Sequence, residues 1–318
     1  MKNKIPIFFT IDEAYAPYFC VALLSLMDNA SKKYNYNIHV VYKDLSKETI
    51  DKIKSLENDR FKIIFTEMYR DLRKITNRKE NILRENLFTL TIYYRIFISV
   101  MFEEYDKAIY LDSDICVTGD ISELYNIELG DNLFGGCSDI SCMDNEILCN
   151  YFKGNAGIDV SEYINSGILL MNMKELRNCN FEEHFLYLLT KYHFDTICPD
   201  QDYINVMSYG RIKHLSNEWN AMPTKGNKII KNPKIIHYNL FFKPWHFDNV
   251  DYEEYFWKYA KNSIFKDNIY KEKENYNKEC QEEDLRKLDI LIDRGSKIVN
   301  NEITFKSIIE SGKEKRIW

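Results

Sequence analysis

Apolar runs of strand length alternate with segments of helical period from the start of the chain to about residue 260, and this alternation constrains the fold more than any other feature. Residues 16–30 and 46–58 have helical period, with Ser46 at the position of a helix N-cap. Three runs between them are typical of strands: PIFFT, IHVVY and FKIIF. A β-α-β order of this kind predicts a parallel or mixed sheet covered by helices, with ligands at the carboxyl ends of its strands.

The middle of the chain continues this pattern less regularly. We expect helices at ISELY, at KELRNCNFEEHFLYLLTKY and at residues 203–209. We expect strands at KAIYL, LFGGC, ILLMNM, IKHL and KIIHY.

The composition changes near residue 263, after which KDNIYKEKENYNKECQEEDLRK is almost wholly polar. Apolar residues then return at near-helical spacing: Leu285, Leu288, Leu291 and Ile292. We therefore predict a main domain over residues 1–262 and a charged, largely helical C-terminal extension over residues 263–318. Because the extension mixes both charge signs, packing on the domain or a partner chain is favoured over membrane attachment. KEKRIW at its end leaves peripheral association with the inner face of the cell membrane as an alternative.

Composition excludes several classes of function. The net charge is −6 with a pI near 5.7, and basic residues are interleaved with acidic ones, so nucleic acid is not expected as the main partner. Eight cysteines without a C-x-x-C pair argue against a disulfide framework, and the loose cluster 137–149 lacks the spacing of a zinc site. The first apolar stretch ends at Asp12, short of a signal peptide or membrane span, which favours a cytoplasmic protein.

The stretch KAIYLDSDICVT, residues 107–118, places two carboxylates at the end of an apolar run. In extended geometry Asp112 and Asp114 leave the same face, with Cα atoms roughly 6.5 Å apart. Two such charges at the end of a buried strand repel each other unless a cation lies between them, and a hard divalent ion meets that need. In a chain with 49 acidic residues, the same short pattern is also often a solvated loop.

Phosphatases of the haloacid-dehalogenase type also have an apolar strand followed by Asp-x-Asp, where the first carboxylate attacks phosphorus. Such enzymes customarily carry Thr or Val two residues after the second Asp, where this chain has Cys116. A convincing later acidic pair for magnesium is also missing. The phosphatase interpretation is therefore the weaker one.

A second informative stretch is IIHYNLFFKPWHF, residues 235–247. A neutral His237 imidazole would complete an oxygen-rich metal shell and would favour Mn²⁺ somewhat over Mg²⁺, while the Lys243 ammonium suits phosphate oxygens. Taken alone, His237 and Trp245 are equally consistent with core residues. When His237 and Trp245 are considered together with the two aspartates, the interpretation as core residues becomes less favourable.

Six stretches together resemble glycosyltransferase family eight over roughly residues 5–260. In chain order they are FFTIDEAYAPYFCVALLSL, TIYYRIFI, AIYLDSDICV, YINSGILLMNM, DQDYIN and HYNLFFKPWH. The resemblance implies a GT-A nucleotide-sugar-binding fold, with a mixed central sheet flanked by helices, followed by the C-terminal helical tail. Residues 1–262 would be the GT-A catalytic domain. The implied ligands are a UDP-sugar donor and Mn²⁺, with Mg²⁺ as the alternative metal.

The resemblance also implies roles for individual residues. The metal ligands would be Asp112, Asp114 and His237. The nucleotide-sugar site would comprise Thr10, Asp12, Tyr15, Arg95, Asp112, Ser113, Asn165 and Lys243, with Asp12 on the uracil edge and Tyr15 stacked on its face. Catalysis at the sugar would involve Asp200, Gln201 and Arg95.

Structural alternatives exist for several of these residues. Tyr15 is also suited to opening the first helix, and Arg95 to pairing with a structural carboxylate. Asn165 suits a turn, and Asp200 with Gln201 suits helix capping. Two positions depart from the family pattern: Ala14 replaces a frequent polar residue, and Leu240 replaces a glycine three residues after the metal histidine.

We therefore expect a retaining, Mn²⁺-dependent enzyme of bacterial glycan biosynthesis. It would transfer galactose or glucose from a UDP-sugar to a glycan, glycolipid or glycoprotein acceptor. Same-face attack is favoured over double displacement, because the Gln201 amide is a poor nucleophile. A non-catalytic nucleotide-sugar-binding protein is the main alternative. Asp114→Ala is expected to abolish Mn²⁺-dependent UDP binding and to leave the fold intact.

Overall fold

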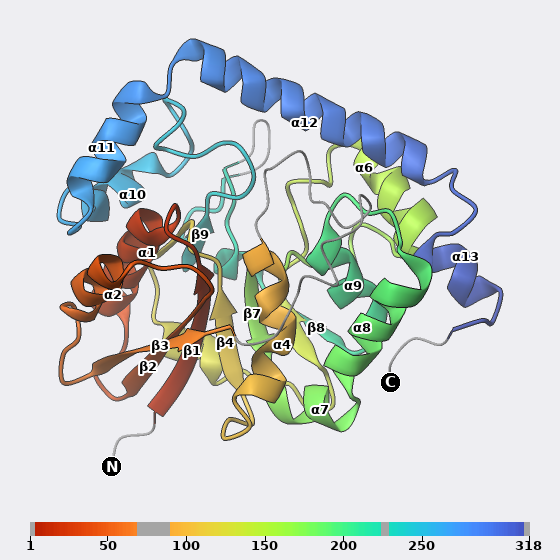
Figure 1. Cartoon of the computed structure of the whole chain (residues 1–318), viewed down its shortest axis with the longest axis horizontal. Coiled ribbons are helices and arrows are strands. Elements are labelled where there is room, and N and C mark those ends of the chain that lie inside the picture. Colours follow the sequence, from red (N-terminus) through yellow and green to blue (C-terminus); the bar gives the residue numbers. More distant parts are fainter. Residues whose placement is uncertain (1–3, 69–89, 224–228, 315–318) are drawn as a thin grey trace. The chain divides into compact units, whose positions relative to one another are not determined.

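The computed structural model describes residues 4–68, 90–223 and 229–314 (Figure 1). The chain divides into two compact units. The first unit combines residues 1–68, 108–128 and 216–287, and the second combines residues 69–107, 129–215 and 288–318. Each unit therefore gathers segments that are distant in the sequence, and each is described separately below.

The first unit contains four of the seven strands of the larger sheet, in the order β3-β2-β1-β4. The strands are β1 (Lys4–Ile11), β2 (Asn35–Tyr42), β3 (Phe61–Glu67) and β4 (Ala108–Leu111), and their pairs are parallel. Residues 5–9 of β1 are all buried, as expected for a parallel strand covered on both faces. Helices α1 (Ala16–Asn29) and α2 (Lys47–Lys54) follow β1 and β2, and the Ser46 side chain caps α2 as predicted.

A second, two-stranded sheet lies in the same unit. Strands β5 (Ile115–Val117) and β9 (Ile235–His237) pair antiparallel, and their register sets Ile115 opposite His237. Three helical elements accompany them: α5 (Ile121–Tyr125), η5 (Asn217–Trp219) and α10 (Glu253–Ala260). Trp245 and Phe256 are buried in the apolar cluster that packs against this sheet. The loop after β9 is thereby anchored in the core.

The second unit contains the other three strands of the larger sheet: β6 (Phe134–Gly136), β7 (Ile168–Met171) and β8 (Ile212–His214). Strand β6 is antiparallel to β7 and parallel to β8, so the sheet is mixed, as predicted. The helical elements are η3 (Leu90–Tyr93), α4 (Tyr94–Met101), α6 (Glu146–Tyr151), η4 (Phe152–Ala156), α7 (Met173–Asn178), α8 (Phe181–Tyr192), α9 (Pro199–Met207) and α13 (Phe305–Glu310).

Two helix predictions in this unit were wrong in their bounds. The single helix expected from residue 174 to 192 is two helices, α7 and α8, because Asn180 between them adopts a left-handed backbone (φ 51°). Helix α9 begins at Pro199 instead of Tyr203, since proline is well suited to the first turn of a helix.

The C-terminal tail is helical, comprising α11 (Lys266–Asn275), α12 (Lys278–Ile298) and α13. Residues 263–287 belong to the first unit and residues 288–318 to the second. The division into a domain at 1–262 and an extension at 263–318 stays a prediction, as does association with a membrane surface. Within the described ranges, the structure has no helix with the length and apolar character needed to cross a bilayer. All eight cysteines are free thiols.

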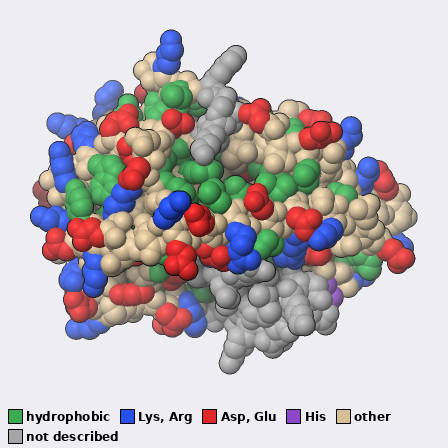
Figure 2. All heavy atoms as spheres, turned by 90° about the horizontal axis from the view of Figure 1, so that it is seen from above, with side chains coloured by type: hydrophobic (Ala, Val, Ile, Leu, Met, Phe, Trp, Pro, Cys, Tyr) green, Lys and Arg blue, Asp and Glu red, His purple; other side chains and the backbone are tan. Residues whose placement is uncertain are grey.

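Figure 2 shows Lys and Arg side chains interspersed with Asp and Glu over one face of the molecule. This distribution follows the interleaved charges of the sequence. A face on which both charge signs are mixed in this way does not present an extended positive field.

Candidate functional site

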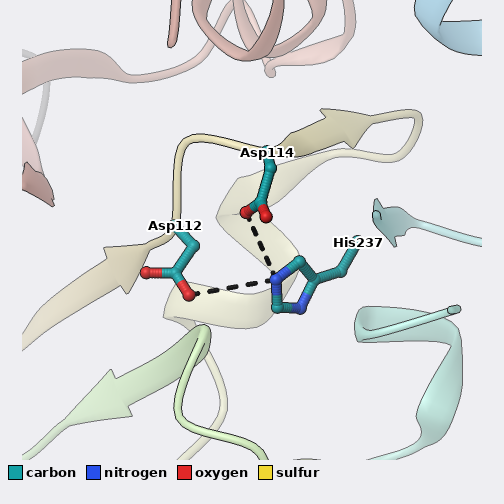
Figure 3. A group of neighbouring side chains, drawn as sticks. All are labelled: Asp112, Asp114 and His237. Carbon is teal, nitrogen blue, oxygen red and sulfur yellow. Dashed lines mark ion pairs between the residues drawn. The ribbon is translucent and has the colours of Figure 1, made fainter. Parts of the chain in front are cut away.

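The two aspartates and the histidine predicted as metal ligands lie together in the first unit. Asp112 follows β4 directly, Asp114 precedes β5, and His237 is the last residue of β9. The antiparallel pairing of β5 with β9 sets Asp114 beside His237, and the Tyr238 N–H donates to the Asp114 carbonyl at 2.9 Å. One ligand atom from each of the three side chains lies within 4.8 Å of the others, and the side chains point toward one another (Figure 3).

The geometry at His237 fits a metal ligand. Its Nε2 lies 3.3 Å from Asp114 Oδ1 and 3.8 Å from Asp112 Oδ2, while Nδ1 lies 3.1 Å from Asn220 Oδ1. We assign the proton to Nδ1, because an amide oxygen only accepts hydrogen bonds. The Nε2 lone pair then faces two carboxylates, an arrangement that favours a cation between the three groups. Two carboxylate oxygens and one imidazole nitrogen suit a divalent metal, and a hydrogen bond to the other ring nitrogen is the usual support for such a ligand.

Lys243 completes the charge balance around Asp114. Its ammonium lies 2.5 Å from Asp114 Oδ2 and donates to the Tyr238 carbonyl at 2.8 Å. Both charged side chains are about nine-tenths buried. Burial raises the pKa of the Asp114 carboxyl, but the positive charge of Lys243 is the largest of the effects that lower it, and on balance this pKa lies well below its ordinary value. Asp114 is therefore ionised at neutral pH, as metal ligation requires.

Hydrogen bonds from residues of β4 and β1 orient the Asp112 carboxylate. The Tyr110 hydroxyl donates to Asp112 Oδ1 at 2.8 Å, so the other oxygen is the one that faces His237. Thr10 Oγ1 lies 2.9 Å from the same Tyr110 oxygen and must donate to it, because the single phenolic proton is already used. The pairing of β1 with β4 explains this contact. Thr10, predicted as a nucleotide contact, thus acts on Asp112 through Tyr110.

The other predicted nucleotide residues of this unit lie at the end of β1 and beside the metal ligands. Asp12 follows β1, and its Oδ1 accepts the Tyr15 N–H at 3.0 Å, which closes a turn before α1. Tyr15 itself is 37% exposed. The Ser113 hydroxyl is buried and has no hydrogen-bond partner in the described part of the chain. The roles of these three residues toward a nucleotide stay predictions.

Arg95 and Asp200 form a buried pair in the second unit. Arg95 Nε lies 3.2 Å from Asp200 Oδ2, and both side chains are less than 10% exposed. The guanidinium also donates to the Ser166 carbonyl at 2.6 Å and to the Ser166 hydroxyl at 3.0 Å, and that hydroxyl donates to Asp200 at 2.9 Å. The structural carboxylate considered for Arg95 is therefore present, and it is a residue predicted to be catalytic.

Gln201 and Asn165 are held by a residue that the sequence did not single out, Asp139. The Gln201 amide donates to Asp139 Oδ2 at 3.0 Å, and the Asn165 amide donates to the same oxygen at 3.2 Å. Gln201 Oε1 accepts the Ser166 N–H at 2.9 Å. Asp139 is 2% exposed and comes shortly after β6. Its one sequence signal was a position just beyond a strand-like run, which is also where Asp112 lies.

The predicted site residues thus form two clusters. The first unit holds Thr10, Asp12, Tyr15, Asp112, Ser113, Asp114, His237 and Lys243, and the second holds Arg95, Asn165, Asp200 and Gln201. The first cluster has the donor set of a metal and phosphate site. The second is a buried hydrogen-bond network of amides, carboxylates and one guanidinium.

Comparison with known proteins agrees with this chemistry. The family model described as glycosyl transferase family 8 matches residues 6–249. A lipopolysaccharide 1,2-glucosyltransferase of Escherichia coli is 27% identical over 261 residues, covering 74% of this chain and 71% of the relative. General stress protein A of Bacillus subtilis is 25% identical over 253 residues, covering 74% and 85%. The family match supports the transferase interpretation over the phosphatase one.

Two solved structures have the same fold. The galactosyltransferase LgtC, solved with donor and acceptor sugar analogs, has a TM-score of 0.70 and 23% identity, covering 82% of this chain and 96% of that one. The bifunctional glycosyltransferase WbbM has a TM-score of 0.72 and 24% identity, and the match covers 86% of this chain and 52% of WbbM. This chain therefore spans about half of WbbM. Both are GT-A glycosyltransferases, which confirms the predicted fold.

Proposed function

The chain belongs to glycosyl transferase family 8, and we propose that it is a Mn²⁺-dependent, retaining hexosyltransferase that uses a UDP-sugar. Glycosyl transfer, with a nucleotide-sugar donor and a glycan acceptor, follows from the family. The choice of Mn²⁺, of UDP and of glucose or galactose is the proposal. The observation that carries it is the group of Asp112, Asp114 and His237, whose ligand atoms converge, with Lys243 paired to Asp114.

The donor end of the reaction is assigned to the first unit. A divalent cation held by Asp112, Asp114 and His237 would supply Lewis-acid stabilisation of the diphosphate leaving group. The Lys243 ammonium adds a positive charge beside the same carboxylate, which favours an anion at this place. Asp12 and the partly exposed Tyr15, at the end of β1, would hold the uracil ring.

The sugar end is assigned to the cluster of the second unit. Asp200 is paired with Arg95 and accepts a hydrogen bond from Ser166, both of which stabilise the carboxylate and weaken it as a nucleophile. Gln201 is held through both ends of its amide. These contacts support same-face attack: the acceptor hydroxyl bonds to the anomeric carbon, the bond from that carbon to the phosphate oxygen breaks, and this oxygen takes the hydroxyl proton.

Glucose and galactose are proposed because the E. coli relative is described as a glucosyltransferase and LgtC as a galactosyltransferase. The acceptor is proposed to be a glycan, glycolipid or glycoprotein of a bacterial surface.

A melting-temperature screen tests the proposal. The protein is heated with UDP, UDP-glucose, UDP-galactose or UDP-N-acetylglucosamine, each with MnCl₂ and each again with a chelator. We expect stabilisation by UDP that the chelator removes, because a ligand bound only to the folded state raises its melting temperature. Absence of a metal-dependent shift with every nucleotide would refute the proposal. Release of UDP from UDP-glucose or UDP-galactose then separates an enzyme from a nucleotide-sugar-binding protein.

A further inference from the structure

The loop that carries Lys243 is held by side chains from the C-terminal tail. We propose that Lys273 of α11 and Gln281 of α12 are positioning residues that fix this loop, residues 241–248, and thereby set the affinity of the site for the diphosphate of the donor. The inference rests on the proposed function for its link to the diphosphate. Both residues lie outside residues 6–249, the stretch that the family model matches. The contacts that they make with the loop therefore come from a segment outside the region that defines the family.

Lys273 binds the end of the loop. Its ammonium donates to the Phe247 carbonyl at 2.8 Å and to the Pro244 carbonyl at 3.1 Å, and it pairs with Asp248 at 2.7 Å. Within the loop, the N–H groups of residues 246 and 247 both donate to the Lys243 carbonyl at 2.9 Å, which forms a single tight turn. A turn of this kind leaves its last carbonyls without a backbone donor, and an ammonium at that end satisfies them.

Gln281 and its neighbours bind the same loop at His246. The Gln281 amide donates to the His246 carbonyl at 2.6 Å. The His246 ring stacks on Tyr276, with centroids 3.6 Å apart and planes 7° apart, and its Nε2 lies 3.2 Å from Glu272 Oε1. Burial, followed by the charges of Lys243 and Lys273, lowers the pKa of His246 to about 3. The ring is therefore neutral at pH 7, and we assign its proton to Nε2, where it donates to the Glu272 carboxylate.

The opposite side of the loop is fixed by aromatic packing. Trp245 is 1% exposed and stacks on Tyr18, with centroids 3.9 Å apart, and it also contacts Phe256. The Lys243 ammonium lies 5.4 Å from the Trp245 ring centroid. Trp245 therefore fixes one side of the loop, and Lys273 with Gln281 fixes its carbonyls on the other.

External contacts matter for this loop because the residue that leads into it has a strained backbone. Leu240, just before it, has φ 58°, in the left-handed region that disfavours residues with a Cβ. A strained conformation persists only where the surroundings hold it in place. Lys243, three residues further on, pairs with Asp114 in this conformation of the loop, so the contacts from α11 and α12 hold the backbone that carries the charge facing the diphosphate.

Lys273→Met tests the inference in the full-length protein, because it keeps the length of the side chain and removes the charge and the donors. Lys273→Arg restores the donors, and Lys271→Met, on the exposed side of the same helix, is the matched control. Two quantities are measured: hydrogen exchange of the His246 and Phe247 amides, and the Kd of UDP with Mn²⁺ by calorimetry. Gln281→Ala, which removes a single hydrogen bond, serves if Lys273→Met does not fold.

We expect Lys273→Met to speed exchange of the two amides at least tenfold and to weaken UDP at least fivefold. Lys273→Arg should return both values to within about twofold of wild type, and Lys271→Met should leave both unchanged. Unchanged amide exchange would overturn the inference, and so would faster exchange with unchanged UDP affinity. If the wild-type protein binds no UDP, the proposed function fails separately, since the exchange measurement still decides whether Lys273 holds the loop.

Discussion

Replacing Asp114 with alanine leaves the buried Lys243 ammonium without its carboxylate partner. This loss should lower the stability of the variant. The Lys243 ammonium lies 2.5 Å from the Asp114 carboxylate, and its side chain is 9% exposed. Removing one partner of a buried ion pair costs about 3–5 kcal/mol, because the remaining charge has lost its compensation. We therefore expect Asp114→Ala to lower the free energy of unfolding by about this amount. The sequence-based expectation of an intact fold does not allow for this cost.

The double variant Asp114→Ala/Lys243→Met separates stability from binding. With both charges removed, most of the lost stability should return, since replacing a buried pair with apolar groups is often neutral. Metal-dependent UDP binding should nevertheless stay absent, because a metal ligand is still missing. Urea unfolding measures the first quantity and calorimetry with Mn²⁺ and UDP the second. Equal stability of the two variants would refute the reasoning about Lys243, and retained UDP binding in the double variant would refute the metal site.

The pH dependence of the pair has a definite sign. The folded-state pKa of Asp114 lies below its ordinary value: burial raises it, but the neighbouring charge of Lys243 leads the effects that lower it. A depressed carboxyl pKa contributes stability that is fully present above the unfolded-state pKa, about 3.9, and is lost as the pH falls toward the folded-state pKa. Between about pH 4 and pH 2 the wild-type protein should therefore lose more stability than the double variant. Parallel acid profiles of the two proteins would contradict this assignment.

Three further predictions follow from the structure. Asn220→Ala removes the acceptor that orients the His237 ring, and a change of this kind weakens metal affinity about 10–100-fold; a Mn²⁺ titration of UDP binding measures it. Burial raises the pKa of Glu314, but hydrogen bonds led by that from Lys191 lower it to about 2. The stability that Glu314 contributes is therefore complete above about pH 4.5 and is lost as the pH falls toward 2. In Glu314→Gln the free energy of unfolding should depend less on pH in that range. Leu240→Gly should change the free energy of unfolding by less than about 1 kcal/mol. Relief of the left-handed backbone, about 1–2 kcal/mol, offsets the lost packing and the added entropy of the unfolded state. Leu240→Val should lower the free energy of unfolding in the same urea assay.

The clustering of Asp112, Asp114 and His237 was predictable from the sequence because their positions follow from strand ends. Asp112 and Asp114 flank the break between two apolar runs, and His237 closes a third. Chain order and apolar period indicate where such strands end, and ligands gather there. Arg95 and Gln201 were predicted as site residues from the resemblance to the family, because the apolar periodicity of the sequence does not single them out.

Asp139 and the helix break at Asn180 were missed for different physical reasons. Asp139 matters because two amides from distant positions, Asn165 and Gln201, converge on one of its oxygens, and such a convergence has no signature in local composition. At Asn180 the apolar period continues through the break, so only the left-handed backbone reveals it. The tail posed a third difficulty. Lys273 binds backbone carbonyls, which every residue possesses, so its partners could not be inferred from side-chain types.

Each aspartate of the Asp112, Asp114 and His237 group uses one carboxylate oxygen for a supporting contact and turns the other toward the centre of the group. Asp112 receives the Tyr110 hydroxyl on Oδ1 and turns Oδ2 toward His237, while Asp114 receives Lys243 on Oδ2 and turns Oδ1 the same way.

His237 follows the same rule, with Nδ1 on Asn220 and Nε2 facing the carboxylates. An ammonium has three donors, and within the described residues Lys243 uses two, on Asp114 and the Tyr238 carbonyl. Its third donor is available to a phosphate oxygen without breaking either bond. Because metal and phosphate would meet atoms that are already oriented, loss of a supporting residue such as Asn220 or Tyr110 should weaken binding by a limited factor, whereas loss of a ligand residue should abolish it.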